Sequence, residues 1–296
     1  MSRDQVSDRF ATLTFERSIA APVATLYAAW ISPAARAVWA ATAPSVTVEF
    51  LEADSRVGGR EVSLCKVAGE PDLRVEGGWL DLVPEARTVG YEVVSKEGDR
   101  QSAALVTADF AAEGETSRIK VTVQLASLAA DMADGYRQGF NAGIDNLRAV
   151  AERTLLLQRV IKAPVPVVWG AWMNSESLPK WWGPDGFSCR TSRIDLRAGG
   201  EWVFDMIGPD GTVFPNHHKY GAMIPEARLD YTLHWGENGP KHADAWATFE
   251  DQDGATKVTL GMVMATAKEY HDAKGFGAVE LGLQTLGKLA KIIGAE

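Results

Sequence analysis

The stretch LQRVIKAPVPVVWGAW at residues 157–172 decides the fold, because it has a near copy, FERSIAAPVATLYAAW, at residues 15–30. Each stretch is typical of a strand that ends in Ala-Pro and a helix that ends in tryptophan, since proline suits the first turn of a helix. Internal self-similarity of this kind indicates a duplicated structure. Six pairs of identical residues keep one register: Arg17 and Arg159, Ile19 and Ile161, Ala21 and Ala163, Pro22 and Pro164, Trp30 and Trp172, and Trp39 and Trp181.

The correspondence continues to the end of both halves. The later matches are RVGGRE (56–61) with RAGGEW (197–202), VPEAR (83–87) with IPEAR (224–228), and GIDNL (143–147) with GLQTL (282–286). A repeat of about 140 residues is too long for a solenoid unit and suits a complete domain. We therefore predict two tandem domains of the same fold, residues 1–152 and 153–296.

The second copy gives the clearer secondary-structure pattern. A strand over 153–163 is followed by a helix from Pro164 to about Met173, and a short helix over 175–182 has a serine at its start. From Phe187 to about Thr266 apolar residues alternate with polar ones, and glycine-rich or charged turns divide this segment into six strands. Apolar residues then return at helical spacing and predict one long C-terminal helix. Its stripe is Val279, Leu283, Leu286, Ala290 and Ile293.

This order predicts an α+β fold. An antiparallel sheet that needs cover on one face, and a long helix with a single apolar stripe, bury their apolar surfaces together when the sheet curves around the helix. Two short helices would follow the first strand. The glycine pairs Gly58-Gly59 and Gly199-Gly200 stand where a strand needs a sharp bend, which favours strong curvature.

Several spaced motifs, in order, resemble a known family. They are IKAP (161–164), WWGP (181–184), AGGE (198–201), YGAMIPEARLDY (220–231) and FGAVELGLQTLGKLAK (276–291). The chain resembles the SRPBCC superfamily of START and Bet v 1-like helix-grip proteins, and within it the activator of Hsp90 ATPase C-terminal-like family. The resemblance covers nearly all of both halves and implies two tandem helix-grip domains, each with an apolar cavity between sheet and helix. The first copy departs from it at WAAT (39–42), where the second has WWGP.

Composition narrows the range of partners. The net charge is -9, from 39 acidic and 30 basic residues, and no run of basic residues occurs, so we expect no nucleic-acid partner. The charged N-terminus is unlike a secretory signal, and no stretch approaches the length of a membrane-spanning helix. We therefore expect a cytoplasmic protein without a membrane partner.

The candidate binding residues lie in the second half. Aromatic residues, methionines and one histidine in this half suit a flat or flexible apolar ligand. The predicted lining consists of Trp182, Phe204, Met206, His218, Tyr220, Met262, Met264 and Phe276. Because His217 and His218 are adjacent on a strand and point to opposite faces, they cannot share a metal ion, and we predict neither a metal nor a cofactor.

The sequence favours a binding protein for a small hydrophobic or amphipathic molecule, with the site in the second domain and no catalytic residue assigned. Two alternatives stay open. An enzyme of the cyclase or hydratase type would use His218 or Asp205 in the pocket. A protein-interaction module, similar to an Hsp90 co-chaperone domain, would expose a large apolar patch. We also expect the two halves to pack as a pseudo-symmetric pair, since duplication often preserves a dimer contact.

Overall fold

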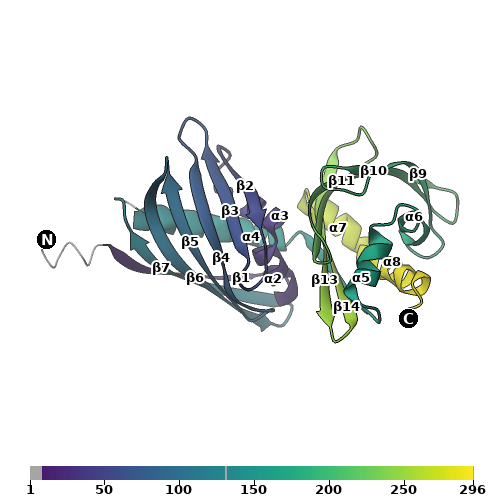
Figure 1. Ribbon diagram of the computed structural model, residues 1–296, viewed down its shortest axis with the longest axis horizontal. Helices are drawn as coiled ribbons and strands as arrows, with labels where there is room; N and C mark the ends of the chain where they lie inside the picture. The colour runs from purple at the N-terminus through teal and green to yellow at the C-terminus, as the bar shows by residue number, and fades with distance from the viewer. Residues whose placement is uncertain (1–8, 131, 296) are drawn as a thin grey trace, which may run out of the picture. The chain divides into compact units, whose positions relative to one another are not determined.

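A computed structural model describes residues 9–130 and 132–295 of the chain (Figure 1). The chain divides into two compact units, Met1–Glu152 and Arg153–Glu296. Each unit has its own sheet and its own closing helix, so the two are described one at a time.

The first unit is a sheet with helices on one face. In its described part the elements are β1 (Phe10–Ile19), α2 (Val23–Ile31), α3 (Pro33–Trp39), β2 (Val46–Ala53), β3 (Arg60–Val67), β4 (Leu73–Val83), β5 (Arg87–Lys96), β6 (Asp99–Glu113), β7 (Thr116–Ser127) and α4 (Met132–Ala151). The antiparallel sheet has the order β1-β7-β6-β5-β4-β3-β2. Helix α4 packs against β1 and β7 and against both short helices, and Figure 1 shows it crossing one face of the sheet.

The second unit repeats this topology. Its elements are β8 (Thr154–Ile161), α5 (Val165–Trp172), α6 (Leu178–Trp181), β9 (Ser188–Ile194), β10 (Glu201–Ile207), β11 (Val213–Ile224), β12 (Arg228–His234), β13 (Lys241–Gln252), β14 (Ala255–Met264), α7 (Ala267–Gly275) and α8 (Ala278–Ile292). The sheet order is β8-β14-β13-β12-β11-β10-β9, again antiparallel. The described residues therefore form the predicted α+β helix-grip fold twice.

The closing segment of the second unit differs from the predicted single helix. Helix α7 begins at a capping box, in which the Thr266 side chain accepts from the Glu269 amide and the Glu269 carboxylate accepts from the Thr266 amide. It ends at Gly275, and α8 starts after Gly277, whose φ of 82° is left-handed. Glycine tolerates this conformation, so the backbone turns between the two helices. The predicted apolar stripe lies on α8 and its C-cap.

The short helix after α5 is also smaller than predicted. Helix α6 has four residues, and the turn before it is held by Asn174, whose Oδ1 accepts from the amides of Glu176 and Ser177 at 2.9 and 3.0 Å. Asparagine in this position forms a local turn that competes with an early helix start. The predicted helix start at Ser175 is therefore wrong.

The duplication extends to individual hydrogen bonds. The Gly58 amide donates to Trp79 O at 2.8 Å, and the Gly199 amide donates to Tyr220 O at 3.1 Å. Both glycines have left-handed φ values, 78° and 76°, in the turn that precedes a strand. Trp39 Nε1 donates to Ala29 O at 3.0 Å, and Trp181 Nε1 donates to Ala171 O at 3.3 Å. Identical contacts at corresponding positions establish which residues of the two units are equivalent.

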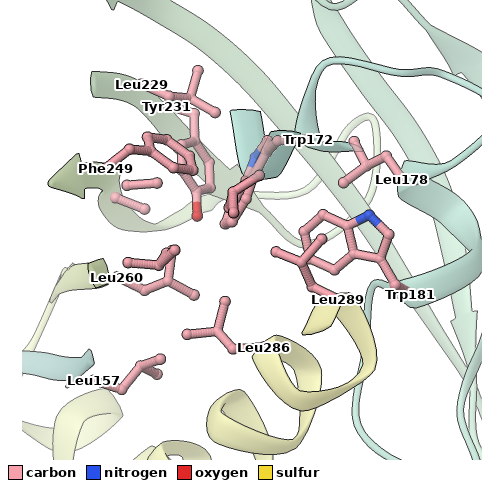
Figure 2. Packing of buried hydrophobic residues seen from close by; sticks show 14 of the residues in the cluster. Leu157, Trp172, Leu178, Trp181, Leu229, Tyr231, Phe249, Leu260, Leu286 and Leu289 are labelled. Atoms are coloured by element: carbon pink, nitrogen blue, oxygen red, sulfur yellow. The ribbon is translucent and has the colours of Figure 1, made fainter. Parts of the chain in front are cut away.

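Large aromatic residues fill one end of the second unit's core (Figure 2). Trp172 is 2% exposed, and its ring lies 4.9 Å from that of Trp181 and 5.3 Å from that of Phe249. Leu286 and Leu289 of α8 face this cluster in Figure 2. The apolar stripe of α8 is thus buried against the concave side of the sheet. In the part of the chain that the structure describes, no helix combines the length and apolarity needed to span a membrane.

Candidate functional site

The inward face of the second sheet carries two rows of side chains. Strand pairing places Trp202 opposite His218, His218 opposite Leu233, and continues the row through Ala243 to Met264. The next row runs from Tyr220 through Tyr231 and Ala245 to Met262. Because alternate residues of a strand share a face, His218 and Tyr220 both point toward the core. The two rows bring one imidazole and two phenols together among apolar side chains.

His218 lies in an aromatic box and is 3% exposed. Its ring centroid is 5.3 Å from that of Trp182, 5.5 Å from that of Trp202, 5.0 Å from that of Phe204 and 5.3 Å from that of Tyr231. Trp202 and Phe204 stack on each other at 3.8 Å. Within residues 9–130 and 132–295, no group hydrogen-bonds either ring nitrogen of His218.

Burial lowers the pKa of His218 to about 3, with smaller contributions from His242 and His217. The imidazole is therefore neutral at physiological pH. A neutral imidazole donates at one nitrogen and accepts at the other, so His218 can serve a ligand in both ways.

Tyr220 and Tyr231 extend the same polar surface. Each is 6% exposed, their rings lie 6.3 Å apart, and no group in the described chain hydrogen-bonds either hydroxyl. Burial raises the pKa of both phenols, so both hydroxyls stay protonated. Figure 2 shows the Tyr231 hydroxyl pointing into the interior, in the direction of Leu260. We call His218, Tyr220 and Tyr231 the interior polar trio.

The polar atoms of the trio are not sealed in protein. The sealed and unpartnered side-chain atoms in the described part of the chain are Arg153 Nε, His217 Nδ1, His242 Nδ1 and Thr259 Oγ1. The trio has no partners but is not among them, so its nitrogens and hydroxyls retain surface that a water-sized molecule can reach. Buried polar groups in proteins nearly always have a hydrogen-bond partner, and unpaired ones call for an explanation such as a ligand or water.

The structure brings most of the predicted lining residues together. Phe204 and Met264 belong to the buried core cluster with Tyr220, and Trp182, Met206 and Met262 pack against it. Phe276 does not join them, because it lies at the α7–α8 break and is 70% exposed. Tyr231 and Trp202 were not among the predicted lining residues. Tyr231 had a usable signal, since it closes the YGAMIPEARLDY motif that Tyr220 opens.

The outward face of the second sheet holds the other polar candidates. His217 points away from His218 and its Nε2 lies 2.7 Å from Glu201 Oε2. Asp205, the second predicted catalytic candidate, accepts a hydrogen bond from Arg190 at 2.7 Å on this outward face. It therefore does not lie beside His218. Among residues 9–130 and 132–295, no group of three potential metal-binding side chains occurs.

A separate hollow occurs on the first unit. It has a volume of about 540 Å³ and crosses β1, β7, β6 and β5, with Phe10, Tyr91, Leu105, Gln124 and Ala126 among its lining residues. No residue of α4 lines it, and Phe10 and Tyr91 are 66% and 46% exposed. It is therefore an open groove on the side of the sheet that faces away from the helix.

The lowered pKa of His218 predicts how the stability of the second unit depends on pH. An unfolded histidine binds a proton near pH 6.5, whereas folded His218 does so only near pH 3. Its contribution to stability is complete above pH 6.5 and is lost as the pH falls. At pH 5 we expect a loss of about 2 kcal/mol from this residue, which His218→Phe should remove. Urea unfolding of both proteins at pH 7.5 and pH 5, with exposed His271→Asn as control, measures it. An unchanged pH dependence in His218→Phe would contradict the burial argument.

The motifs of both units agree with one family. The model of the activator of Hsp90 ATPase homolog 1-like protein family matches residues 20–152 and again residues 162–294. The chain belongs to this family. As a member of the activator of Hsp90 ATPase homolog 1-like family it contains the family's domain twice, which is the tandem duplication indicated by the sequence.

Similar solved structures include single-unit and two-unit proteins. A protein from Rhizobium leguminosarum is 30% identical, with 49% of this chain and 95% of that chain covered and a TM-score of 0.44. A protein from Nitrosomonas europaea is 28% identical, with 49% and 96% covered and a TM-score of 0.44. The di-domain ARO/CYC protein BexL of the BE-7585A biosynthetic pathway is 16% identical, with 97% and 99% covered and a TM-score of 0.39. No curated protein matches the chain significantly.

Proposed function

We propose that the second unit of this family member binds a small, largely apolar molecule that carries one or two uncharged polar groups. The observation that carries the proposal is the interior polar trio, whose hydrogen-bonding groups face the core without partners in the described chain. A ligand hydroxyl or carbonyl would supply the missing hydrogen bonds. The surrounding Trp182, Trp202 and Phe204 would cover its apolar part.

The charge of the site favours an uncharged ligand. His218 is neutral and both phenols are protonated. Tyr220 and Tyr231 belong to the hydrophobic core cluster, and the His218 ring lies among Trp182, Trp202 and Phe204. A charged ligand group would lose its hydration there without gaining a counter-ion, which is strongly unfavourable. Phenols, alcohols and ketones on an aromatic or aliphatic skeleton match this environment.

Binding is better supported than acid–base catalysis. A histidine with a pKa of about 3 is a weak base near neutral pH, since catalytic bases work best when their pKa lies near the operating pH. Asp205, the other candidate base, is paired with Arg190 on the outward face. We therefore propose that the trio orients a ligand rather than moving its protons.

We expect the affinity of the second unit for an aromatic ligand to depend on a single hydroxyl group of that ligand. The full chain should bind 2-naphthol about tenfold more tightly than naphthalene, because one good hydrogen bond contributes about 0.5–1.5 kcal/mol and an unfilled polar site is penalised further. Isothermal titration measures both affinities. In the double variant His218→Phe/Tyr231→Phe the preference should fall to within about twofold, whereas His271→Asn on exposed α7 should keep it.

Two results would count against the proposed function. One is that neither naphthalene nor 2-naphthol binds the wild-type chain. The other is that the double variant, shown by circular dichroism to be folded, keeps the wild-type preference for 2-naphthol. The first result would favour a filled core, and the second would place the ligand elsewhere.

We also propose that the protein is cytoplasmic, that it has no nucleic-acid or membrane partner, and that its two halves pack as a pseudo-symmetric pair. A protein partner also stays open, as the alternative of an interaction module.

A further inference from the structure

The first unit has a different interior at the same place. Strand pairing there gives the inward row Glu61–Gly77–Glu92, continued by Ala104 and Leu125. The equivalent row of the second unit is Trp202–His218–Leu233, continued by Ala243 and Met264. Two carboxyl groups thus replace a tryptophan and a leucine.

Glu61 has all the partners that a buried carboxylate needs. Its oxygens accept hydrogen bonds from Arg36 Nη1 at 2.5 and 2.6 Å and from Trp79 Nε1 at 2.9 Å. The Arg36 guanidinium also lies over the rings of Phe50 and Trp79, at 4.9 and 5.2 Å from their centroids. The Arg36 guanidinium therefore pairs with the Glu61 carboxylate.

Glu92 has no such cation. The hydroxyl of Tyr136 from α4 favours the charged form of the Glu92 carboxyl, and this hydroxyl lies 3.2 Å from Ser102 Oγ. In the described chain no lysine, arginine or histidine lies within ion-pair distance of it. Burial raises the pKa of Glu92; Tyr136 and Arg36 act in the opposite direction, and the Glu61 charge adds to the increase. A half-buried carboxyl without a counter-ion is unfavourable for folding, so its presence calls for a role.

Two large side chains of the second unit's interior are replaced by glycine beside Glu92, and the Trp79 ring lies against one of these positions, 3.4 Å from where a Gly90 Cβ would be. Gly77 stands where His218 does, and Gly90 stands where Tyr231 does. Tyr136 approaches from α4 on this side, yet Glu92 still keeps accessible surface. Glu92 as a whole is half-buried, and its oxygens are not among the sealed, unpartnered side-chain atoms of the described chain, so they retain surface that a ligand atom can reach.

We propose that the first unit holds a second binding site, in which an organic ammonium group on a small apolar molecule pairs with Glu92. The ligand would supply the positive charge that the chain does not, and Trp79, Ala104 and Leu125 would contact its apolar part. Cation binding would favour the ionised form of Glu92 and thereby counteract the effect of burial on its pKa, so a proton held by the carboxyl would pass to solvent. The two units would then differ in specificity, one for uncharged and one for cationic ligands.

The test compares n-butyl-, n-hexyl- and n-octylammonium with the alcohols of the same lengths. Isothermal titration of the full chain in two buffers of different ionisation enthalpy, near pH 6, gives affinities and protons released. At least one ammonium ion should bind about tenfold or more tightly than its alcohol and release up to one proton. Glu92→Gln should weaken its binding by about 10–100-fold and abolish the release, since a charged hydrogen bond is lost. Glu115→Gln, in the exposed β6–β7 turn, should change neither.

Three results would overturn the proposal: no binding of any ammonium ion, equal binding of ammonium ions and alcohols, or unchanged binding and proton release in Glu92→Gln. We do not expect Glu92→Gln to unfold the first unit, because replacing an unpaired carboxyl by its amide should preserve or raise the thermal midpoint. A loss of binding in this variant would therefore report the loss of the carboxylate. The site is separate from the interior polar trio, so His218→Phe/Tyr231→Phe should leave ammonium binding intact.

Discussion

Arg36→Leu is expected to destabilise the first unit by about 3–5 kcal/mol, because it leaves the Glu61 carboxylate buried without a cation. Glu61 is 8% exposed and the Arg36 side chain 20% exposed. Leucine itself fits this position of the fold, since the equivalent residue of the second unit is Leu178, which is 1% exposed. The loss should therefore come from the unpaired charge rather than from a steric conflict.

A second substitution separates charge from packing in this prediction. Arg36→Leu/Glu61→Gln should regain most of the lost stability, because it removes the charge that Arg36 neutralised. Hydrogen exchange of β3 and β4 peptides, measured with mass spectrometry, reports the first unit alone and avoids assuming that the whole chain unfolds in one step. A double variant as unstable as Arg36→Leu, or a single variant that loses less than about 1 kcal/mol, would contradict the account.

The second large effect is expected for Arg228→Met in the second unit. Arg228 is 6% exposed; its Nη2 donates to Asp230 Oδ1 at 2.7 Å, and its Nε lies 3.0 and 3.1 Å from the two carboxylate oxygens. Its guanidinium also lies 5.7 Å from the centroid of a Trp246 ring. Because the Asp230 side chain, which is only 15% exposed, would lose its cation, we expect a loss of about 3–5 kcal/mol.

The duplication supplies a matched control for this substitution. Arg87 closes the equivalent PEAR motif of the first unit and pairs with Asp81 at 2.6 Å, but the two side chains are 50% and 39% exposed. An exposed ion pair contributes little, so Arg87→Met should cost less than about 1 kcal/mol. Hydrogen exchange of β12 peptides for one variant and β5 peptides for the other measures both. Equal losses in the two units would show that burial does not set the energy of these pairs.

Much of the fold can be predicted from the sequence because the same motifs occur in the same order in both halves. The repeated IxAP and PEAR motifs fix the register of the two units, and period-two and helical spacing identify six later strands and the closing stripe. The break between α7 and α8 was missed because the stripe of α8 continues the same spacing. The left-handed conformation at Gly277, which separates the two helices, is visible only in the structure.

The candidate site was only partly predictable. Alternation shows that His217 and His218 face opposite sides, but not which of them faces the core. Tyr220 and Tyr231 meet because β11 pairs with β12 in one particular register, which a single sequence does not specify. The two units also differ at Arg36 and Glu61, which stand in place of Leu178 and Trp202. This difference can be recognised only when the strand pairing and the helix packing are known.

The central claim is that the interior polar trio receives the polar group of an apolar ligand. A crystal structure of the full chain with 2-naphthol tests it most directly. We predict that the naphthol ring lies between the second sheet and α8, beside Trp182 or Trp202, with its oxygen within hydrogen-bond distance of His218, Tyr220 or Tyr231. Density for naphthol only in the open groove of the first unit, with the trio still unpartnered, would contradict the claim.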